Sequence, residues 1–156
     1  YFNRGKNGEN LYFSPLIQAC KKRNLSYIVF EEPAASNQIT GKNADTVNAK
    51  LVVEAANGPT TKRADNILEK RGIPIVPDLL GNSGSVIIAY FEWVQNRAGY
   101  YWPIELVEER LDRMIIAAYD KARVAAGKHN VGLRLATCML GVERVAYFDK
   151  LRGVYS

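Results

Sequence analysis

The sequence predicts an α/β fold in which about three parallel strands form a sheet flanked by helices, followed by a helical C-terminal part. Three short runs rich in apolar, β-branched or aromatic residues begin at residues 25, 51 and 73. A loop rich in Gly, Pro, Asn or Ser follows each run, which is typical of βαβ units. Right-handed crossovers would place these loops at one edge of the sheet, where ligands of open α/β folds bind.

The first two strands are expected at residues 25–30 (LSYIVF) and 51–55 (LVVEA). The second run does not alternate between apolar and polar residues, as expected for a strand buried on both faces. Residues 38–50 lie between the two strands and carry scattered apolar side chains among polar ones. That segment is predicted to be weakly helical.

A helix is predicted over residues 62–71. Thr61 is a suitable N-cap, and Gly72 stands where a C′ glycine is favoured. The apolar residues have the spacing of one helical face: Ala64, Ile67 and Leu68. A third strand is expected at residues 73–77, with Pro74 near a strand end or an edge of the sheet. The segment PDLLGNSGS follows, and its small residues indicate a loop.

Three helices are expected in the remaining sequence. Residues 86–96 are mostly apolar, and a longer helix is predicted to begin with Pro103 at its first position and to end at Gly127. The apolar face of that longer helix consists of Val107, Leu111, Met114, Ile115, Ala118 and Ala122. The last helix, at about residues 133–151, is expected to bury Leu135, Met139, Val142 and Val145 and to leave Arg134, Glu143 and Lys150 in solvent. Both long helices are expected to be structural.

Composition indicates one globular domain. The 156 residues are 47% hydrophobic and 24% charged, and no apolar stretch approaches the roughly 20 residues of a membrane helix. The net charge of +5 is spread along the chain, so neither a nucleic acid nor a membrane is expected as a partner. Cys20, Cys138 and the single His129 do not form a metal-binding pattern, and no metal is expected.

Several motifs in a fixed order resemble the nucleotide-binding domain of glutamate dehydrogenases. The sequence contains EAANGPTT, PD, NSGSV and AYFEWVQN, where that family has EGANGPTT, PD, NAGGV and SYFEWVQN. The similarity extends upstream through PAASNQIT and downstream through LRLATCMLGVERV to KLRG, and covers about residues 25–153. The string YFEWVQN favours glutamate dehydrogenase over the leucine, phenylalanine and valine enzymes. The resemblance implies a partial Rossmann-like sheet.

The resemblance also implies a reaction, the reversible oxidative deamination of L-glutamate to 2-oxoglutarate and ammonia with NAD or NADP. It implies that Asn57 contacts the nicotinamide end of the cofactor. It implies that Gly58 also contacts the cofactor and that the loop residues Pro33, Ala34 and Ala35 line the same site. Small residues permit close approach of a flat ring, and an Asn amide can both donate and accept hydrogen bonds. The alternative is that Asn57 and Gly58 only form a turn before Pro59.

Three departures from the family pattern bear on the site. Ala89 stands where the family has a Ser that reaches the substrate carboxylate, so the substrate contact is expected to be weakened. Ala55 replaces a Gly, at a cost of about 1–3 kcal/mol if the position is tightly packed or needs a positive φ. Residues 82–86 read NSGSV instead of NAGGV, and Ser is well tolerated at a helix start.

Large parts of such an enzyme are not found in this sequence. Neither the GxGxxG unit nor a substrate domain with catalytic lysines is recognisable, so no catalytic residue is assigned and the isolated chain is expected to be inactive. Residues 1–14 are interpreted as a tag or other non-native leader, and residues 15–156 as a partial dinucleotide-binding domain. A non-catalytic remnant or interaction module is the alternative. The resemblance implies a cytoplasmic homohexamer for the full-length form.

Overall fold

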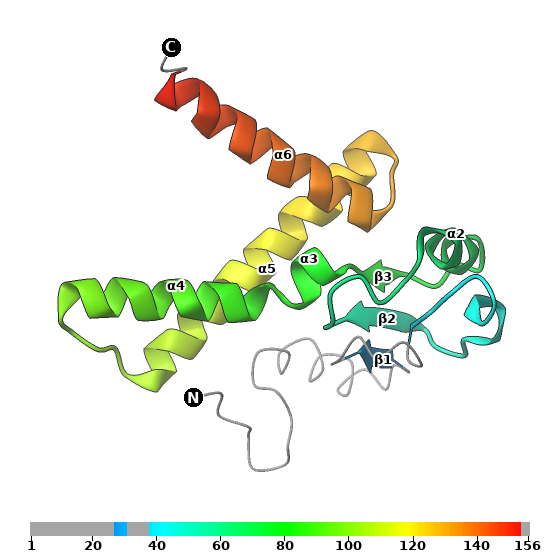
Figure 1. The fold of residues 1–156 in the computed structure, drawn as a ribbon, viewed down its shortest axis with the longest axis horizontal. Coiled ribbons are helices and arrows are strands. Elements are labelled where there is room, and N and C mark those ends of the chain that lie inside the picture. The colour runs from blue at the N-terminus through cyan, green and yellow to red at the C-terminus, as the bar shows by residue number, and fades with distance from the viewer. Residues whose placement is uncertain (1–26, 31–37, 154–156) are drawn as a thin grey trace.

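The computed structural model describes residues 27–30 and 38–153, and Figure 1 shows how their helices and strands are arranged. The elements in chain order are β1 (Tyr27–Phe30), η3 (Ala44–Thr46), β2 (Leu51–Glu54), α2 (Lys62–Lys70), β3 (Ile75–Val76), α3 (Asp78–Gly81), α4 (Ser83–Ala98), α5 (Ile104–His129) and α6 (Leu133–Arg152). The predicted fold class, a partial α/β Rossmann-like domain with a helical C-terminal part, is confirmed.

The sheet is parallel and has the strand order β1-β2-β3. In the central strand β2, Val52, Val53 and Glu54 are all buried, so the strand is covered on both faces. Val52 packs with the α2 residues Ala64 and Leu68, and Val53 packs on the opposite face against Ala122 of α5. The two faces of the sheet are therefore covered by different helices.

The helical expectation for residues 38–50 is wrong, because only Ala44–Thr46 form a short 3-10 helix. In this segment, side chains form hydrogen bonds with backbone N–H and C=O groups that would bond to other backbone groups in a helix. The Asn43 Oδ1 accepts from the Thr40 N–H at 2.7 Å, and Arg71 donates to the carbonyls of Ala44 and Val47 at 2.6 and 2.8 Å. Such local bonds compete with helix formation.

The prediction for α2 is confirmed at both ends. The Thr61 Oγ1 accepts from the Ala64 N–H, and Gly72 has a φ of +71°, as a C′ glycine should. The third strand is shorter than expected, since only Ile75 and Val76 pair with β2. The segment after it begins with a helical turn, α3, rather than a loop.

The α4–α5 pair forms a helical hairpin with its own apolar cluster, in which Phe91 packs against Leu111 and Ile115. Gln95 is buried there, and its Oε1 accepts from the Trp102 N–H at 2.6 Å. Pro103 is the N-cap of α5 rather than its first residue, and α5 continues past Gly127 to His129. The helix ends at Asn130, which has a φ of +52°. Met114, predicted to be buried, is 45% exposed.

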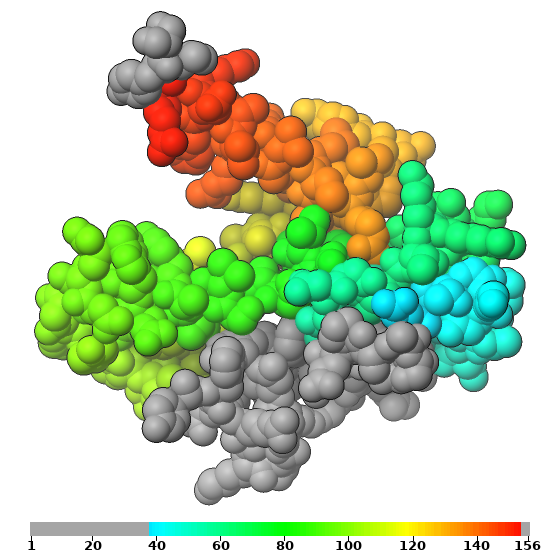
Figure 2. Space-filling view, in the orientation of Figure 1, coloured from blue at the N-terminus to red at the C-terminus, as the bar shows by residue number. Residues whose placement is uncertain are grey.

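The burial predicted for α6 is wrong. Leu135, Val142 and Val145 are 53, 69 and 71% exposed, Met139 is half-buried, and Ala136 is the buried residue of the helix. Figures 1 and 2 show the C-terminal half of α6 pointing away from the sheet and standing clear of α4. Helical periodicity predicts an apolar face but does not say whether another element packs against it. Among the described residues, no helix is both long and apolar enough to cross a membrane.

Candidate functional site

Two of the three loops expected at the carboxyl edge of the sheet lie side by side. The Asn82 Nδ2, just after α3, donates to the Asn57 Oδ1 in the loop after β2 at 2.7 Å. The Gly58 N–H in that same loop donates to the Asp78 Oδ2 at 2.9 Å. These two bonds join segments that are 25 and 20 residues apart in the chain. The third loop, with Pro33, Ala34 and Ala35, lies outside the described residues.

Asn57 and Gly58 are both exposed at this edge. Gly58 has a φ of +58°, and among the described residues no atom beyond its chain neighbours lies within 4 Å of the position that a Cβ would take there. The described residues thus leave the outer side of this loop open, and its left-handed residue favours Gly. Both the cofactor role and the simple turn before Pro59 are compatible with this geometry.

Ala55, which replaces a family glycine, is half-buried and is not among the residues of positive φ. Ala55 therefore does not carry the destabilisation that was expected if its position needed a positive φ. The close approach that requires glycine is at Gly81 instead. A Cβ at Gly81 would overlap the backbone carbonyl oxygen of Glu54, so α3 lies directly on the end of β2.

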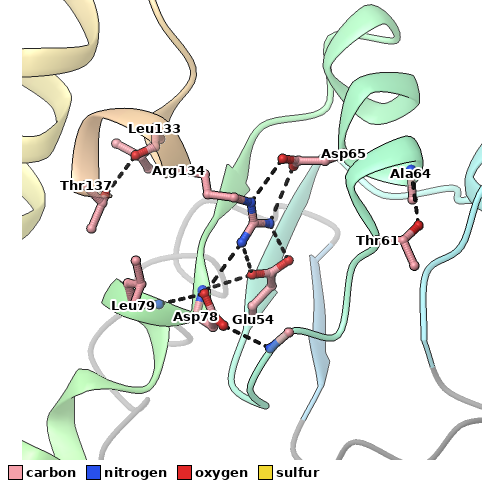
Figure 3. Close-up of polar contacts among 10 residues, drawn as sticks. Glu54, Thr61, Ala64, Asp65, Asp78, Leu79, Leu133, Arg134 and Thr137 are labelled. Atoms are coloured by element: carbon pink, nitrogen blue, oxygen red, sulfur yellow. Dashed lines mark hydrogen bonds and ion pairs between the residues drawn. The ribbon is translucent and has the colours of Figure 1, made fainter. Parts of the chain in front are cut away.

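A partly buried ion cluster lies behind the two loops, and its Glu54 side chain is fully buried. We call Arg134, Glu54, Asp65 and Asp78 the Arg134 cluster; Figure 3 shows the guanidinium between Asp65 on one side and Glu54 and Asp78 on the other. Arg134 donates to the two Glu54 carboxylate oxygens at 2.9 and 2.7 Å, a bidentate pair. Its Nε donates to Asp65 at 3.0 Å, and its Nη1 lies 3.5 Å from Asp78. Arg134 was predicted to be solvated, and that prediction is wrong.

The electrostatics of the Arg134 cluster favour the charged guanidinium. Burial lowers the pKa of Arg134, but the hydrogen bonds and charges of Glu54 and Asp65 outweigh burial and raise that pKa above its ordinary value. A raised pKa stabilises the fold at all pH values below the ordinary Arg pKa and loses this effect only as pH rises through the raised value. Arg134 therefore stays charged throughout the neutral range, and its own titration adds no pH dependence there.

Helix α4 extends the site away from the sheet. Its N-cap, Asn82, makes no side-chain cap bond, and the side-chain nitrogen of Asn82 donates to Asn57. Ala89 is exposed on α4, seven residues after Asn82. Seven residues are about two helical turns, which places Ala89 on the same side of α4 roughly 10 Å further along. Next to it, Tyr90 and Trp93 are stacked and exposed.

The Arg134 cluster was not found from the sequence. Glu54 inside an apolar strand was a signal, since a charge in such a position needs a partner. Nothing in the pattern identified that partner, because Arg134 lies 80 residues away. Within the described part of the chain, no cluster of three or more His, Cys, Asp or Glu residues has the arrangement of a metal site.

Comparisons with known proteins agree on one family. The model of the Glutamate/Leucine/Phenylalanine/Valine dehydrogenase family matches residues 26–153. The catabolic NAD-specific glutamate dehydrogenase RocG of Bacillus subtilis is 48% identical over 122 residues, which are 78% of this chain and 29% of that protein. The NAD-specific glutamate dehydrogenase of Peptoniphilus asaccharolyticus is 46% identical over 129 residues, 83% of this chain and 31% of that protein.

Solved structures give the same result. The crystal structure of glutamate dehydrogenase from Peptoniphilus asaccharolyticus aligns with a TM-score of 0.75 at 39% identity, covering 99% of this chain and 37% of that one. The hetero-hexameric glutamate dehydrogenase from Thermus thermophilus, in its Leu-bound form, aligns with a TM-score of 0.78 at 27% identity and covers 92% and 38% of the two chains. The chain thus spans about a third of the length of these relatives.

Proposed function

The chain belongs to the Glutamate/Leucine/Phenylalanine/Valine dehydrogenase family, and from that premise we propose that it is part of an NAD(P)-dependent glutamate dehydrogenase. The reaction is the reversible oxidative deamination of L-glutamate to 2-oxoglutarate and ammonia. The observation that carries this proposal is the match of residues 26–153 to the family, with relatives of 46 and 48% identity that are named NAD-specific glutamate dehydrogenases.

The cofactor is proposed to bind at the carboxyl edge of the sheet, against Asn57 and Gly58. This is supported by the exposure of both residues and by the open space outside Gly58. In the described part of the chain Asn57 accepts a bond through its oxygen, so its amide nitrogen can donate to a carboxamide or ribose. Pro33, Ala34 and Ala35 are proposed to line the same site. When bound, a nicotinamide ring supplies the hydride acceptor or donor, and the names of the relatives favour NAD.

The substrate is proposed to approach from α4, near Ala89. A methyl group cannot donate a hydrogen bond to the side-chain carboxylate of L-glutamate, so this helix contributes shape rather than a polar contact there. No catalytic residue is assigned to this chain. The groups that move protons are proposed to come from the remaining two thirds of the full-length enzyme.

The full-length enzyme is proposed to be a cytoplasmic homohexamer. The compartment is supported by the short connection between α4 and α5, from Gly99 to Pro103, which is similar to the small bacterial form. Hexameric assembly is supported by one structural relative that is named hetero-hexameric.

The alternative function is a non-catalytic remnant or interaction module derived from this domain. Helix α6 exposes apolar residues, including Val142 and Val145. Such residues suit a protein interface, and this observation favours an interaction module. The coding sequence upstream of this chain discriminates between the two functions. An in-frame extension that carries GxGxxG and a lysine-bearing domain supports the enzyme, whereas a natural start near residue 1 supports the remnant.

The cofactor role is tested by an Asn57→Ala variant in the full-length protein. Removal of one neutral hydrogen bond is expected to lower kcat/KM for the nicotinamide cofactor about 3- to 10-fold. Asn66→Ala, on the exposed surface of α2, is the matched control and should leave kcat/KM unchanged. Equal kcat/KM values for the Asn57→Ala variant and the wild type would argue against a cofactor contact at Asn57.

A further inference from the structure

We propose that Arg134 is a positioning residue that holds the Asn57–Gly58 loop in place from helix α6. Arg134 lies on α6 and does not touch the loop itself. It acts through two carboxylates, Glu54 and Asp78. The functional meaning of the loop rests on the proposed cofactor role, whereas the positioning can be measured without any cofactor.

The first step is the pair between Arg134 and Glu54. Glu54 is the last residue of β2, is fully buried and immediately precedes the loop. The bidentate bonds at 2.9 and 2.7 Å fix the plane of its carboxylate. A further bond of the guanidinium, to Asp65 on α2, holds Arg134 in this orientation from the opposite side.

The second step leads from Glu54 and Arg134 to Asp78. The Glu54 Oε2 accepts from the Asp78 N–H at 2.9 Å, which fixes the backbone at the start of α3. The guanidinium lies 3.5 Å from the Asp78 Oδ1, and this oxygen also accepts from the Leu79 N–H at 2.9 Å. With its Oδ1 held, the Asp78 carboxylate presents its other oxygen to the loop.

The third step reaches Gly58. The Asp78 Oδ2 accepts from the Gly58 N–H at 2.9 Å. This bond to a charged acceptor is stronger than the neutral bond between Asn82 and Asn57. On the other side of Gly58, the Ile39 N–H donates to the Pro59 carbonyl at 2.9 Å, a bond that does not involve Arg134. Loss of Arg134 removes the cation that orients Asp78 and thereby weakens the tether at Gly58 itself.

Amide hydrogen exchange of the full chain, followed residue by residue by NMR, tests this positioning. In Arg134→Met, the Gly58 amide is expected to lose about tenfold or more of its protection, as for loss of one charge-assisted bond. Amides of the α4–α5 hairpin, such as that of Ile115, should keep their protection. Arg144→Met is the matched control, an exposed arginine on the same helix, and should leave Gly58 unchanged.

Arg134→Met leaves the Glu54 carboxylate buried without its cation, so the variant can fail to fold. The double variant Glu54→Gln/Arg134→Met removes both charges, while the Gln oxygen can still accept from the Asp78 N–H. Selective loss of protection at Gly58 in the double variant supports the positioning role. Protection of Gly58 equal to that of the wild type in the folded double variant would overturn it.

Cofactor binding is measured separately, by titrating the full-length protein with NAD. If the wild type shows no NAD binding while Gly58 still depends on Arg134, the positioning role stands and the cofactor role fails. If NAD binds with the same affinity in the wild type and the folded double variant, cofactor binding does not depend on the position that Arg134 gives the loop, and the functional part of the inference is wrong.

Discussion

At the residue scale, the fully buried carboxylate of Glu54 connects several elements of the fold. Its charge is balanced by Arg134, and its backbone carbonyl lies against Gly81 of α3. One position thus combines an electrostatic and a steric requirement. Both requirements couple the end of β2 to elements that come much later in the chain.

Replacement of Arg134 tests the electrostatic requirement. Arg134→Met is expected to lower the free energy of unfolding by about 3–5 kcal/mol, because Glu54 is left as a buried charge without its partner. Urea unfolding followed by circular dichroism measures the change. The control is Arg113→Met, whose partner Glu109 is exposed, and there the change should stay within about 0.5 kcal/mol. Equal losses in both variants would mean that the cluster has no special role.

Replacement of Gly81 tests the steric requirement. Gly81→Ala places a methyl group on the Glu54 carbonyl oxygen and is expected to cost about 1–3 kcal/mol of stability. Gly141→Ala, in the middle of α6 with open space around it, should instead stabilise the chain by about 0.5–1 kcal/mol. Thermal unfolding of the two variants gives both values, and a neutral Gly81→Ala would contradict the close approach.

Sequence reasoning succeeded at this scale where the requirement was local. Thr61 and Gly72 were identified because caps depend on a few neighbouring residues. Arg134 was placed in solvent because an isolated arginine on a helix gives no sign of a partner 80 residues earlier. The proposed roles of Asn57, Gly58 and Ala89 came from family resemblance and remain predictions.

At the scale of elements, local propensity and tertiary packing agree for β2 and α2 and disagree elsewhere. The expected helix over residues 38–50 is replaced by side-chain to backbone bonds from Asn43 and Arg71. Helix α6 has the expected bounds to within a residue, but most of its apolar residues are exposed. Periodicity therefore predicted the helix correctly and its surroundings incorrectly.

The N-cap of α2 provides a prediction for one element. Thr61→Ala removes the oxygen that accepts from the Ala64 N–H and is expected to cost about 0.5–1 kcal/mol, at the lower end for caps because that bond is 3.4 Å long. Thr61→Ser keeps the oxygen and should change stability by less. The denaturant midpoints of the two variants are compared in an unfolding titration. Equal midpoints would show that the cap oxygen has no stabilising effect.

The exposure of α6 provides a second prediction. Val142→Ala should change the stability of this chain by no more than about 0.5 kcal/mol, because that side chain is 69% exposed. Leu68→Ala, at a fully buried site in α2, should cost about 2–5 kcal/mol. A large loss for Val142→Ala would show that α6 is packed in solution.

At the scale of the whole molecule, the parallel sheet and the common edge of its loops were predictable from the spacing of the strands, whereas the strand order was not predicted. Parallel strands with right-handed crossovers bring the loops after β2 and β3 to one edge, and the bonds at Asn57 and Gly58 join them there. The spacing could not show how the length of this chain relates to that of its relatives. Comparison with them shows that the chain spans about a third of their length.

The central proposal is that this chain contributes the cofactor side of a glutamate dehydrogenase and that the groups which perform the chemistry come from other parts of that enzyme. The most direct test measures the glutamate-dependent formation of NAD(P)H by the 156-residue chain and by the protein from the longer coding sequence that contains it. We predict turnover for the longer protein and none above blank for the isolated chain. Turnover by the isolated chain, or its absence in the longer protein, would contradict the claim.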